Sequence, residues 1–301
     1  MIIDTETHVF KRFIYSRSTG DNTLANPITW HEHSGDLLVQ EMNVAGVDKV
    51  ILASYDIDDV MWYLKILVPE GWIGSDDYIG GAKYTYQFIK KYPDRFIWFD
   101  AINPLEADCV DWIEDKVKMG LKGVKWLPAF YGEGSSVDGP EAHAVFETCV
   151  RLNLPAVLSF EEIMANAPYT PSEYGQQLVA AAERFPDLKI GLYHAGYGLP
   201  NMLEKEATIR TVKRYDNLYM STALFWVGDN EYPFRSYMAI LKELAERVGV
   251  DKLMWATDWP WTEWFCKYRQ MVTAVQNHAT FLSDAEKSRF MGGTAVEFLN
   301  L

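Results

Sequence analysis

The chain has 301 residues, of which 49% are apolar and 14% aromatic, so it can bury a large core. Its formal net charge is −14 and no basic face is evident, so we expect no nucleic-acid partner. No apolar run reaches the roughly 18 residues that a membrane span needs, and no secretory leader pattern opens the chain. The 3 cysteines are widely spaced, as is typical of reduced thiols, so we expect a cytoplasmic protein that contacts no membrane.

Short apolar runs alternate with longer amphipathic stretches along the whole sequence. Each run is continuously apolar, which is typical of parallel strands that are buried on both faces. The predicted strands span residues 2–8, 49–54, 96–103, 123–130, 155–160, 189–196, 218–225 and 252–260.

Helical patterns lie between most of these strands. Ser172 is the predicted N-cap of a helix over residues 172–185. A capping-box spacing from Ser283 to Glu286 starts a final helix that runs to Leu299. The other predicted helices span residues 107–119, 140–152, 234–248 and 265–279. This alternation predicts one domain over residues 1–301, an α/β fold of the (β/α)8 TIM-barrel type with a C-terminal helix.

Two irregular inserts, residues 11–34 and 55–81, follow the first and second predicted strands. In a barrel they form extended βα loops at the C-terminal face, where active sites lie. The first insert contains His31 and His33, an i, i+2 pair in a predicted loop. His33 is a candidate substrate-binding residue, although a position on the surface fits the pattern equally well.

The first and last strands carry the strongest candidate site. Glu6 and His8 share one face of the first strand, because alternate residues of a strand point the same way. Asp258 follows the apolar residues 253–256 of the eighth strand, which closes against the first in a barrel. Two carboxylates and an imidazole at the mouth can hold a divalent cation. The alternative is a buried acid–histidine pair that only supports the strand.

Three further polar residues lie on or directly after predicted strands. His194 follows the sixth apolar run and precedes a glycine-rich turn, which indicates a position at the barrel mouth. Lys125 on the fourth strand binds a substrate carboxylate, bridges metals if carboxylated, or forms a salt bridge within the barrel. Glu161 shares a face of the fifth strand with Ser159, so it either completes a metal site or begins a solvated acidic loop.

Aromatic residues flank these positions and favour a flat, unsaturated substrate. Ordinary barrel and loop packing explains part of them equally well. Trp126 and Trp259 are the candidate substrate-binding residues among them, and the others are Phe130, Phe225, Trp226 and Trp261. The sequence contains no nucleotide-binding or serine-hydrolase motif, so those classes lack support.

Motifs spread over the whole chain resemble the amidohydrolase superfamily. They are residues 3–8 (IDTETH), 123–125 (GVK) with Pro128, 194–196 (HAG) with 198–200 (GLP), 257–260 (TDWP) and 291–295 (MGGTA). The most similar branch holds aminocarboxymuconate-semialdehyde decarboxylase and the aromatic-acid decarboxylases such as γ-resorcylate decarboxylase. The ExH pattern of the first strand and the TDWP sequence are more like the aromatic-acid enzymes.

The resemblance implies a ligand set and two catalytic residues. Glu6, His8 and Asp258 match metal ligands, and the cofactor is one divalent metal, Zn or Mn. His194 matches the sixth-strand histidine that acts on the substrate, and Asp258 takes part in catalysis as well. The resemblance also implies a homodimer.

Two positions depart from the family pattern. Where relatives carry a histidine at the end of strand five, this chain has Ser159 and Phe160, followed by Glu161. Glu161 therefore replaces that ligand, or the metal is weakly held, or it is absent, as in lactonases that hydrolyse 2-pyrone-4,6-dicarboxylate without metal. Where the decarboxylases carry a glutamate after the sixth-strand motif, this chain has Tyr197, a candidate substrate-binding residue.

Three functions remain open, all with a small molecule as partner. The first, which the resemblance favours, is a metal-dependent, non-oxidative decarboxylase, a C–C lyase of a small aromatic or unsaturated carboxylic acid. There the metal binds the substrate carboxylate and Asp258 or His194 protonates the ring carbon. The second is a hydrolase of a lactone or amide, with Asp258 as general base. The third is a catalytically silent binding protein.

Overall fold

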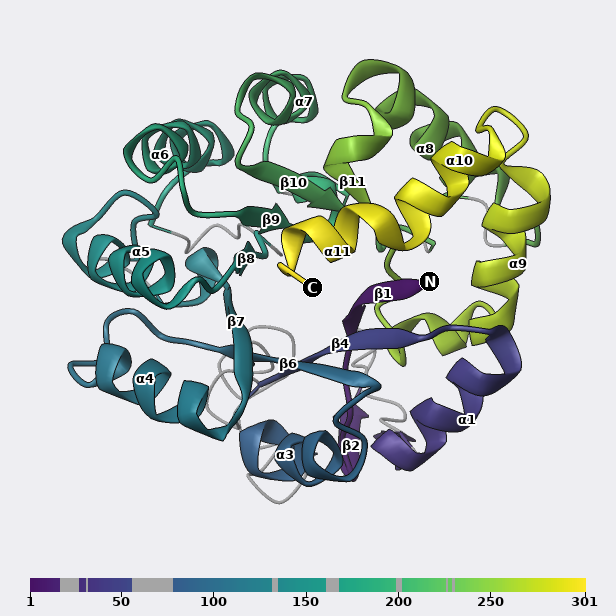
Figure 1. The fold of residues 1–301 in the computed structure, drawn as a ribbon, viewed down its shortest axis with the longest axis horizontal. Helices are drawn as coiled ribbons and strands as arrows, with labels where there is room; N and C mark the ends of the chain where they lie inside the picture. Colours follow the sequence, from purple (N-terminus) through teal and green to yellow (C-terminus); the bar gives the residue numbers. More distant parts are fainter. Residues whose placement is uncertain are drawn as a thin grey trace, which may run out of the picture.

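The computed structural model describes residues 1–16, 27–30, 32–55, 78–131, 135–160, 168–198, 202–225, 227–228 and 231–301. These residues form a ring of 8 strands surrounded by helices (Figure 1). Each strand of the ring pairs in parallel with the next one along the chain. The predicted (β/α)8 TIM barrel is therefore confirmed.

The barrel strands follow the predicted order, with shorter bounds towards the C-terminus. They are β1 (Ile3–Thr7), β4 (Lys49–Ser54), β6 (Phe96–Ala101), β7 (Leu121–Trp126), β8 (Ala156–Leu158), β9 (Ile190–Leu192), β10 (Leu218–Ser221) and β11 (Leu253–Met254). β9 and β11 end early because the chain turns out of the sheet, with positive φ angles at His194 and Asp258.

Backbone hydrogen bonds join the end of the chain's last strand to β1 and close the barrel. The Asp258 amide donates to the Glu6 carbonyl at 2.9 Å, and the His8 amide donates to the Trp259 carbonyl at 2.7 Å. A parallel bridge pairs Thr7 with Trp259. This closure brings Asp258 beside β1.

Helices cover the outside of the barrel (Figure 1). No helix in the described part of the chain is long and apolar enough to cross a membrane. The covering helices are α1 (Gly35–Ala45), α3 (Gly81–Lys91), α4 (Cys109–Met119), α5 (Pro140–Leu152), α6 (Pro171–Arg184), α7 (Lys205–Arg214), α8 (Arg235–Arg247) and α9 (Tyr268–His278). The structure adds α1, α3 and α7, which the sequence analysis does not predict.

The start of α6 differs from the prediction. Thr170, not Ser172, is the N-cap: its side chain accepts from the Glu173 amide, and the Glu173 carboxylate accepts from the Thr170 amide. Pro171 takes the first helical position, where its missing N–H costs nothing because that amide would have no partner within the helix. Ser172 therefore lies within the first turn and is not its cap.

The C-terminal segment covers the amino-terminal end of the barrel (Figure 1, yellow). It consists of α10 (Asp284–Ser288), a π-helical turn (Arg289–Gly293) and α11 (Thr294–Phe298), so the single predicted helix is interrupted. Phe298 packs against Tyr219 with ring centroids 5.3 Å apart. A Cβ on Gly292 would lie 2.2 Å from the Met1 carbonyl oxygen, so this close approach requires glycine.

The two inserts, which were predicted to be irregular loops, contain a small sheet. β2 (Arg12–Ser16) pairs antiparallel with β3 (Pro27–Trp30) and with β5 (Tyr78–Ile79). The expectation of irregular structure is wrong in these segments. β2 and β5 lie more than 60 residues apart in sequence. Strand pairing over such a separation leaves no local sequence pattern from which it could be predicted.

Candidate active site

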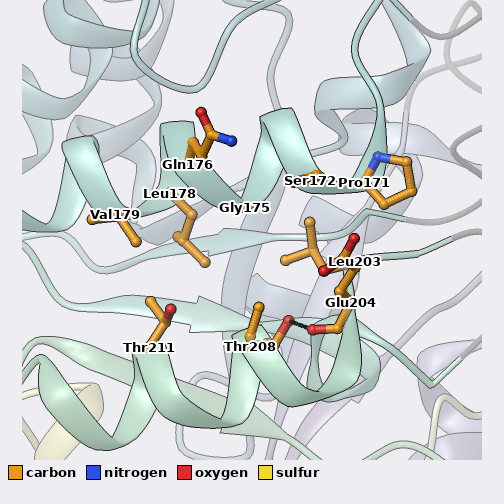
Figure 2. A pocket seen from close by; sticks show the side chains of 11 residues that line it. Pro171, Ser172, Gly175, Gln176, Leu178, Val179, Leu203, Glu204, Thr208 and Thr211 are labelled. Atoms are coloured by element: carbon orange, nitrogen blue, oxygen red, sulfur yellow. Dashed lines mark hydrogen bonds between the residues drawn. The ribbon is translucent and has the colours of Figure 1, made fainter.

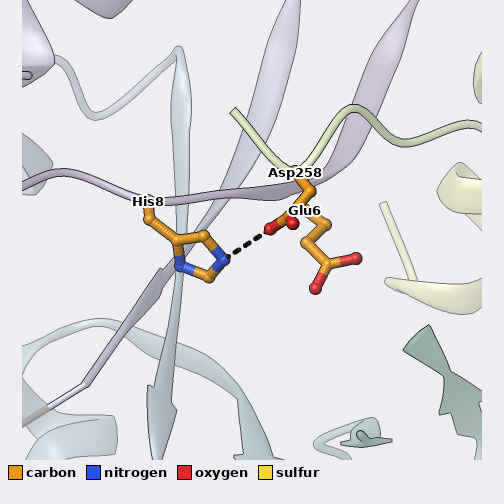
Figure 3. A group of neighbouring side chains, drawn as sticks. All are labelled: Glu6, His8 and Asp258. Atoms are coloured by element: carbon orange, nitrogen blue, oxygen red, sulfur yellow. Dashed lines mark hydrogen bonds and ion pairs between the residues drawn. The ribbon is translucent and has the colours of Figure 1, made fainter. Parts of the chain in front are cut away.

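Glu6, His8 and Asp258 meet at the carboxyl-terminal end of the barrel strands (Figure 3). Each offers a ligand atom that lies within 4.8 Å of the other two. His8 Nε2 is 3.1 Å from Asp258 Oδ1. All three residues are buried. The structure therefore brings together the three side chains that barrel closure is expected to join.

The two histidines at the site are each oriented by a backbone carbonyl. His8 Nδ1 lies 2.7 Å from the Ala53 carbonyl oxygen, and His194 Nδ1 lies 2.9 Å from that of Ala223. A carbonyl oxygen only accepts hydrogen bonds, so Nδ1 carries the hydrogen in both rings. In the neutral rings the lone pair is then on Nε2, which each histidine turns towards an acidic side chain.

The Glu6 carboxylate is completely buried and accepts no hydrogen bond from the residues that the structure describes. Lys125 Nζ and His194 Nε2 each lie 3.6 Å from Glu6 Oε1, beyond hydrogen-bond distance. Burial raises the pKa of Glu6 to about 7, and the attraction of His194 offsets this only in part. Two buried acceptor oxygens are thus open to a ligand.

This donor set fits a divalent metal ion. Glu6 and Asp258 offer carboxylate oxygens and His8 offers Nε2, a mixture that metals such as zinc accept. A cation would also offset the repulsion between the two buried carboxylates. These residues can therefore hold one divalent metal ion.

Lys125 is a completely buried lysine at the carboxyl end of β7. Its ammonium group makes a short contact with the Tyr55 hydroxyl and lies over the Tyr55 and Tyr193 rings, 4.4 and 4.7 Å from their centroids. The Tyr55 ring also lies 4.9 Å from the His8 ring. Tyr55 was not among the residues predicted for the site, although its position directly after β4 is one that reaches the mouth of a barrel.

Three non-glycine residues at the site have left-handed backbone conformations. The φ angles are 51° at His194, 55° at Ala195 and 56° at Asp258. A residue with a Cβ adopts this conformation at a cost, and such residues collect at functional sites. The sixth-strand turn continues into Gly196 at φ 73°, where glycine avoids that cost.

A second polar cluster lies beside Asp258. Trp259 Nε1 donates to Glu263 Oε1 at 2.8 Å, and His33 Nε2 lies 3.0 Å from the other oxygen of the same carboxylate. The Trp259 and His33 rings meet edge to face at 5.2 Å. His33 is therefore buried against the chain that follows β11 and does not lie on the surface.

Trp126 and Tyr197, two candidate substrate-binding residues, lie elsewhere. Trp126 packs edge to face against Phe146 of α5 at 5.9 Å, in the core between strands and helices. It follows Lys125 on β7, and neighbouring residues of a strand point to opposite faces. The Tyr197 ring lies 5.8 Å from Lys205 Nζ on α7. Both side chains face the helical layer.

The fifth-strand ligand position is only partly described. Glu161, the candidate fourth metal ligand, lies outside the described residues, as do His31 and Trp226. Phe160 is buried and makes an edge-to-face contact with Tyr174 of α6 at 5.6 Å. Its ring therefore faces the helical layer.

A surface pocket of about 270 Å³ between α6 and α7 is separate from this site (Figure 2). It is lined by Pro171, Ser172, Gly175, Gln176, Leu178, Val179, Leu203, Glu204, Ala207, Thr208 and Thr211. Glu204 is the one titratable group in this lining, so the pocket offers no acid–base pair. The candidate metal-binding group lies at the barrel mouth, not in this pocket.

Comparison with known proteins places the chain in a family. A family model described as amidohydrolase matches residues 79–301, which is more than half of the sequence. The chain belongs to this family. This amidohydrolase is therefore an enzyme of the amidohydrolase superfamily, which its sequence motifs resemble. No curated protein matches it.

Solved structures share the fold of this amidohydrolase. An amidohydrolase from Burkholderia multivorans with bound zinc has a TM-score of 0.66 at 16% identity, covering 100% of this chain and 99% of that one. A probable 2-pyrone-4,6-dicarboxylic acid hydrolase from Acinetobacter baumannii with citric acid bound has a TM-score of 0.65 at 16% identity, covering 100% of this chain and 99% of that one. A third structure is that of a 5-carboxyvanillate decarboxylase from Novosphingobium aromaticivorans, complexed with manganese and 4-hydroxy-3-methoxy-5-nitrobenzoic acid. Its TM-score is 0.55 at 17% identity, covering 88% of this chain and 80% of that one.

Proposed function

We propose that this amidohydrolase is a metal-dependent, non-oxidative decarboxylase of a small aromatic or unsaturated carboxylic acid. The observation that carries this proposal is the buried Glu6 carboxylate, which has His8 and Asp258 as co-ligands and Lys125 Nζ 3.6 Å away. A cation and an ammonium group side by side suit a substrate with a carboxylate and a neighbouring oxygen. The Tyr55 ring beneath Lys125 suits a flat substrate.

Glu6, His8 and Asp258 are the proposed ligands of one divalent metal, with Glu161 as a proposed fourth. Zinc and manganese are the candidate ions, since both occur in solved structures with this fold. When bound, the metal supplies Lewis-acid polarisation of substrate oxygens.

We assign the proton transfer to Asp258. Its side chain is 12% exposed, against 2% for His194, the other candidate donor, so Asp258 is better placed to exchange a proton with solvent. Protonation of the carbon that bears the carboxylate forms a C–H bond. The C–C bond to the carboxylate then breaks, its electron pair returns to the substrate, and CO₂ leaves.

The remaining side chains orient the substrate. His194 Nε2 and Lys125 Nζ both approach Glu6 Oε1, so an oxygen bound near that atom is within reach of the Lys125 ammonium group and of His194 Nε2, which donates when the imidazole is protonated. Trp259 and His33 form the proposed wall beside Asp258. Holding the substrate between fixed groups removes the entropy cost of aligning the reacting atoms.

The test is release of CO₂ from hydroxybenzoates by protein loaded with zinc or manganese. We expect activity that disappears on complete chelation and returns with the metal. CO₂ release that survives complete chelation contradicts the metal dependence.

Hydrolysis of a lactone or amide is the second candidate. The partial exposure of Asp258 favours it as well, because a general base must meet a water molecule. Product analysis separates the two reactions, since hydrolysis adds water to the substrate without loss of CO₂. Absence of both activities over a broad substrate set supports a binding protein instead.

A further inference from the structure

We infer that Asp4 and Thr257 are positioning residues that hold Asp258 in its left-handed conformation, with its carboxylate towards Glu6 and His8. The inference rests on the proposed function for the role given to Asp258. The side chains that carry it, those of Asp4 and Thr257, belong to residues outside the proposed ligand set.

Asp4 is a completely buried carboxylate on β1, two residues before Glu6. Its Oδ1 accepts from the Thr257 amide at 3.0 Å and from the Glu6 amide at 3.2 Å. Its Oδ2 accepts from the Thr257 hydroxyl at 2.6 Å and from the Tyr268 hydroxyl at 2.9 Å. Both oxygens of Asp4 thus accept two hydrogen bonds each from neighbouring residues. Asp4 therefore positions other residues of the site.

The Thr257 hydroxyl links the residues on both sides of Asp258 to the Asp4 carboxyl group. While it donates to Asp4, it accepts from the Trp259 amide at 3.1 Å. Asp258 lies between these two anchored residues, and its own amide donates to the Glu6 carbonyl at 2.9 Å. The hydrogen bonds therefore enclose the residue whose φ is 56°.

A left-handed aspartate needs such support, because this conformation costs free energy for a residue with a Cβ. If the backbone relaxed to a common conformation, the Asp258 side chain would leave from a different direction. The 3.1 Å contact between Asp258 Oδ1 and His8 Nε2 would then be lost. Residues that orient ligands in this way change metal affinity without touching the metal.

Thr257→Val tests the inference, because valine keeps the shape of threonine and removes the hydroxyl. Thr257→Ser is the matched rescue variant, since it keeps the hydroxyl. Tyr268→Phe is the control, because it removes a donor from the same Asp4 oxygen without touching the turn at Asp258. The measurements are the affinity of the metal-free protein for Zn²⁺ or Mn²⁺ by calorimetry, and thermal unfolding of each metal-free variant.

We expect Thr257→Val to weaken metal binding about 10- to 100-fold, in the range found for residues that orient metal ligands. Thr257→Ser should stay close to the original affinity, and Tyr268→Phe should lower the unfolding temperature while leaving affinity nearly unchanged. Equal affinity in Thr257→Val, or an equal loss in Tyr268→Phe, overturns the inference.

A second readout does not depend on metal binding. A crystal structure of metal-free Thr257→Val should show residue 258 outside the left-handed region, and an unchanged φ there contradicts the inference. If valine prevents folding, Thr257→Ala provides the same comparison. If the original protein binds no metal, the proposed function fails, while this structural test still decides whether the hydroxyl holds Asp258.

Discussion

His8 Nε2 lies 3.1 Å from Asp258 Oδ1, although 250 residues separate the two in sequence. The contact exists because backbone hydrogen bonds join Asp258 and Trp259 to β1. Since His8 Nδ1 is committed to the Ala53 carbonyl, its Nε2 either shares a proton with Asp258 or binds a cation beside it. A metal ion that enters the site is therefore expected to displace a proton.

Asp258→Asn should strongly reduce kcat while the protein stays folded. Asparagine has nearly the same shape but cannot donate a carboxylic proton, and general acid catalysis contributes about 10²- to 10⁴-fold. We expect a loss within that range in kcat. Asp251→Asn, which alters an exposed ion pair with Arg289, is the control and should retain activity. A fully active Asp258→Asn variant removes this residue from the mechanism.

Glu6→Gln should stabilise the metal-free protein and abolish metal binding. Burial raises the pKa of Glu6 to about 7, so the ionised form is unfavourable in the folded state without a cation. A neutral amide avoids that cost. Thermal unfolding with and without Zn²⁺ measures both effects. Tight metal binding by Glu6→Gln would show that Glu6 is not a ligand.

The metal-free protein should lose stability as the pH rises from 5 to 7. Burial raises the pKa of Glu6 from 4.5 to about 7 and that of Asp4 from 3.8 to about 7. Below pH 7 the folded state therefore holds protons that the unfolded state has released, and this stabilisation disappears as the pH passes through 7. For Glu6 alone the loss is about 3 kcal/mol.

Denaturant unfolding at pH 5, 6, 7 and 8 measures this loss. Metal-loaded protein and the Glu6→Gln variant are the controls. Both should show a shallower decline, because the first holds Glu6 ionised and the second cannot ionise. Equal slopes in all three samples contradict the assignment to Glu6.

Lys125→Met should raise KM for the carboxylate substrate by at least about tenfold, as the loss of roughly 1.4 kcal/mol of binding implies. Lys116→Met is the matched control, because Lys116 also pairs with a buried carboxylate, that of Asp100, but in the helical layer. The control should lower stability, since it leaves Asp100 without its cation, and should leave KM unchanged. If both variants raise KM alike, Lys125 acts on stability alone.

The strands were predictable because burial on both faces leaves continuous apolar runs, as in residues 49–54. Local sequence signals also mark helix ends. The N-cap of α6 is nevertheless Thr170 and not Ser172, because Thr170 forms reciprocal hydrogen bonds with Glu173. The small sheet of β2, β3 and β5 was not predicted, since β2 pairs with β5 across a long sequence separation.

At the site, the alternation rule predicts that Glu6 and His8 share a face, and the same rule applied to β7 separates Trp126 from Lys125. Trp126 is packed against α5 for that reason. Tyr55 lacks a motif and is recognised only through its contacts with Lys125 and His8.

The sequence by itself determined the barrel, the family and the identity of the acidic and imidazole side chains at the strand ends. Periodicity and strand order are local properties of the chain, and barrel closure follows from them. Only the tertiary structure decided the protonation pattern of His8, the raised pKa of Glu6 and the left-handed backbone at Asp258. These depend on carbonyls, burial and hydrogen bonds contributed by distant segments, which packing alone brings together.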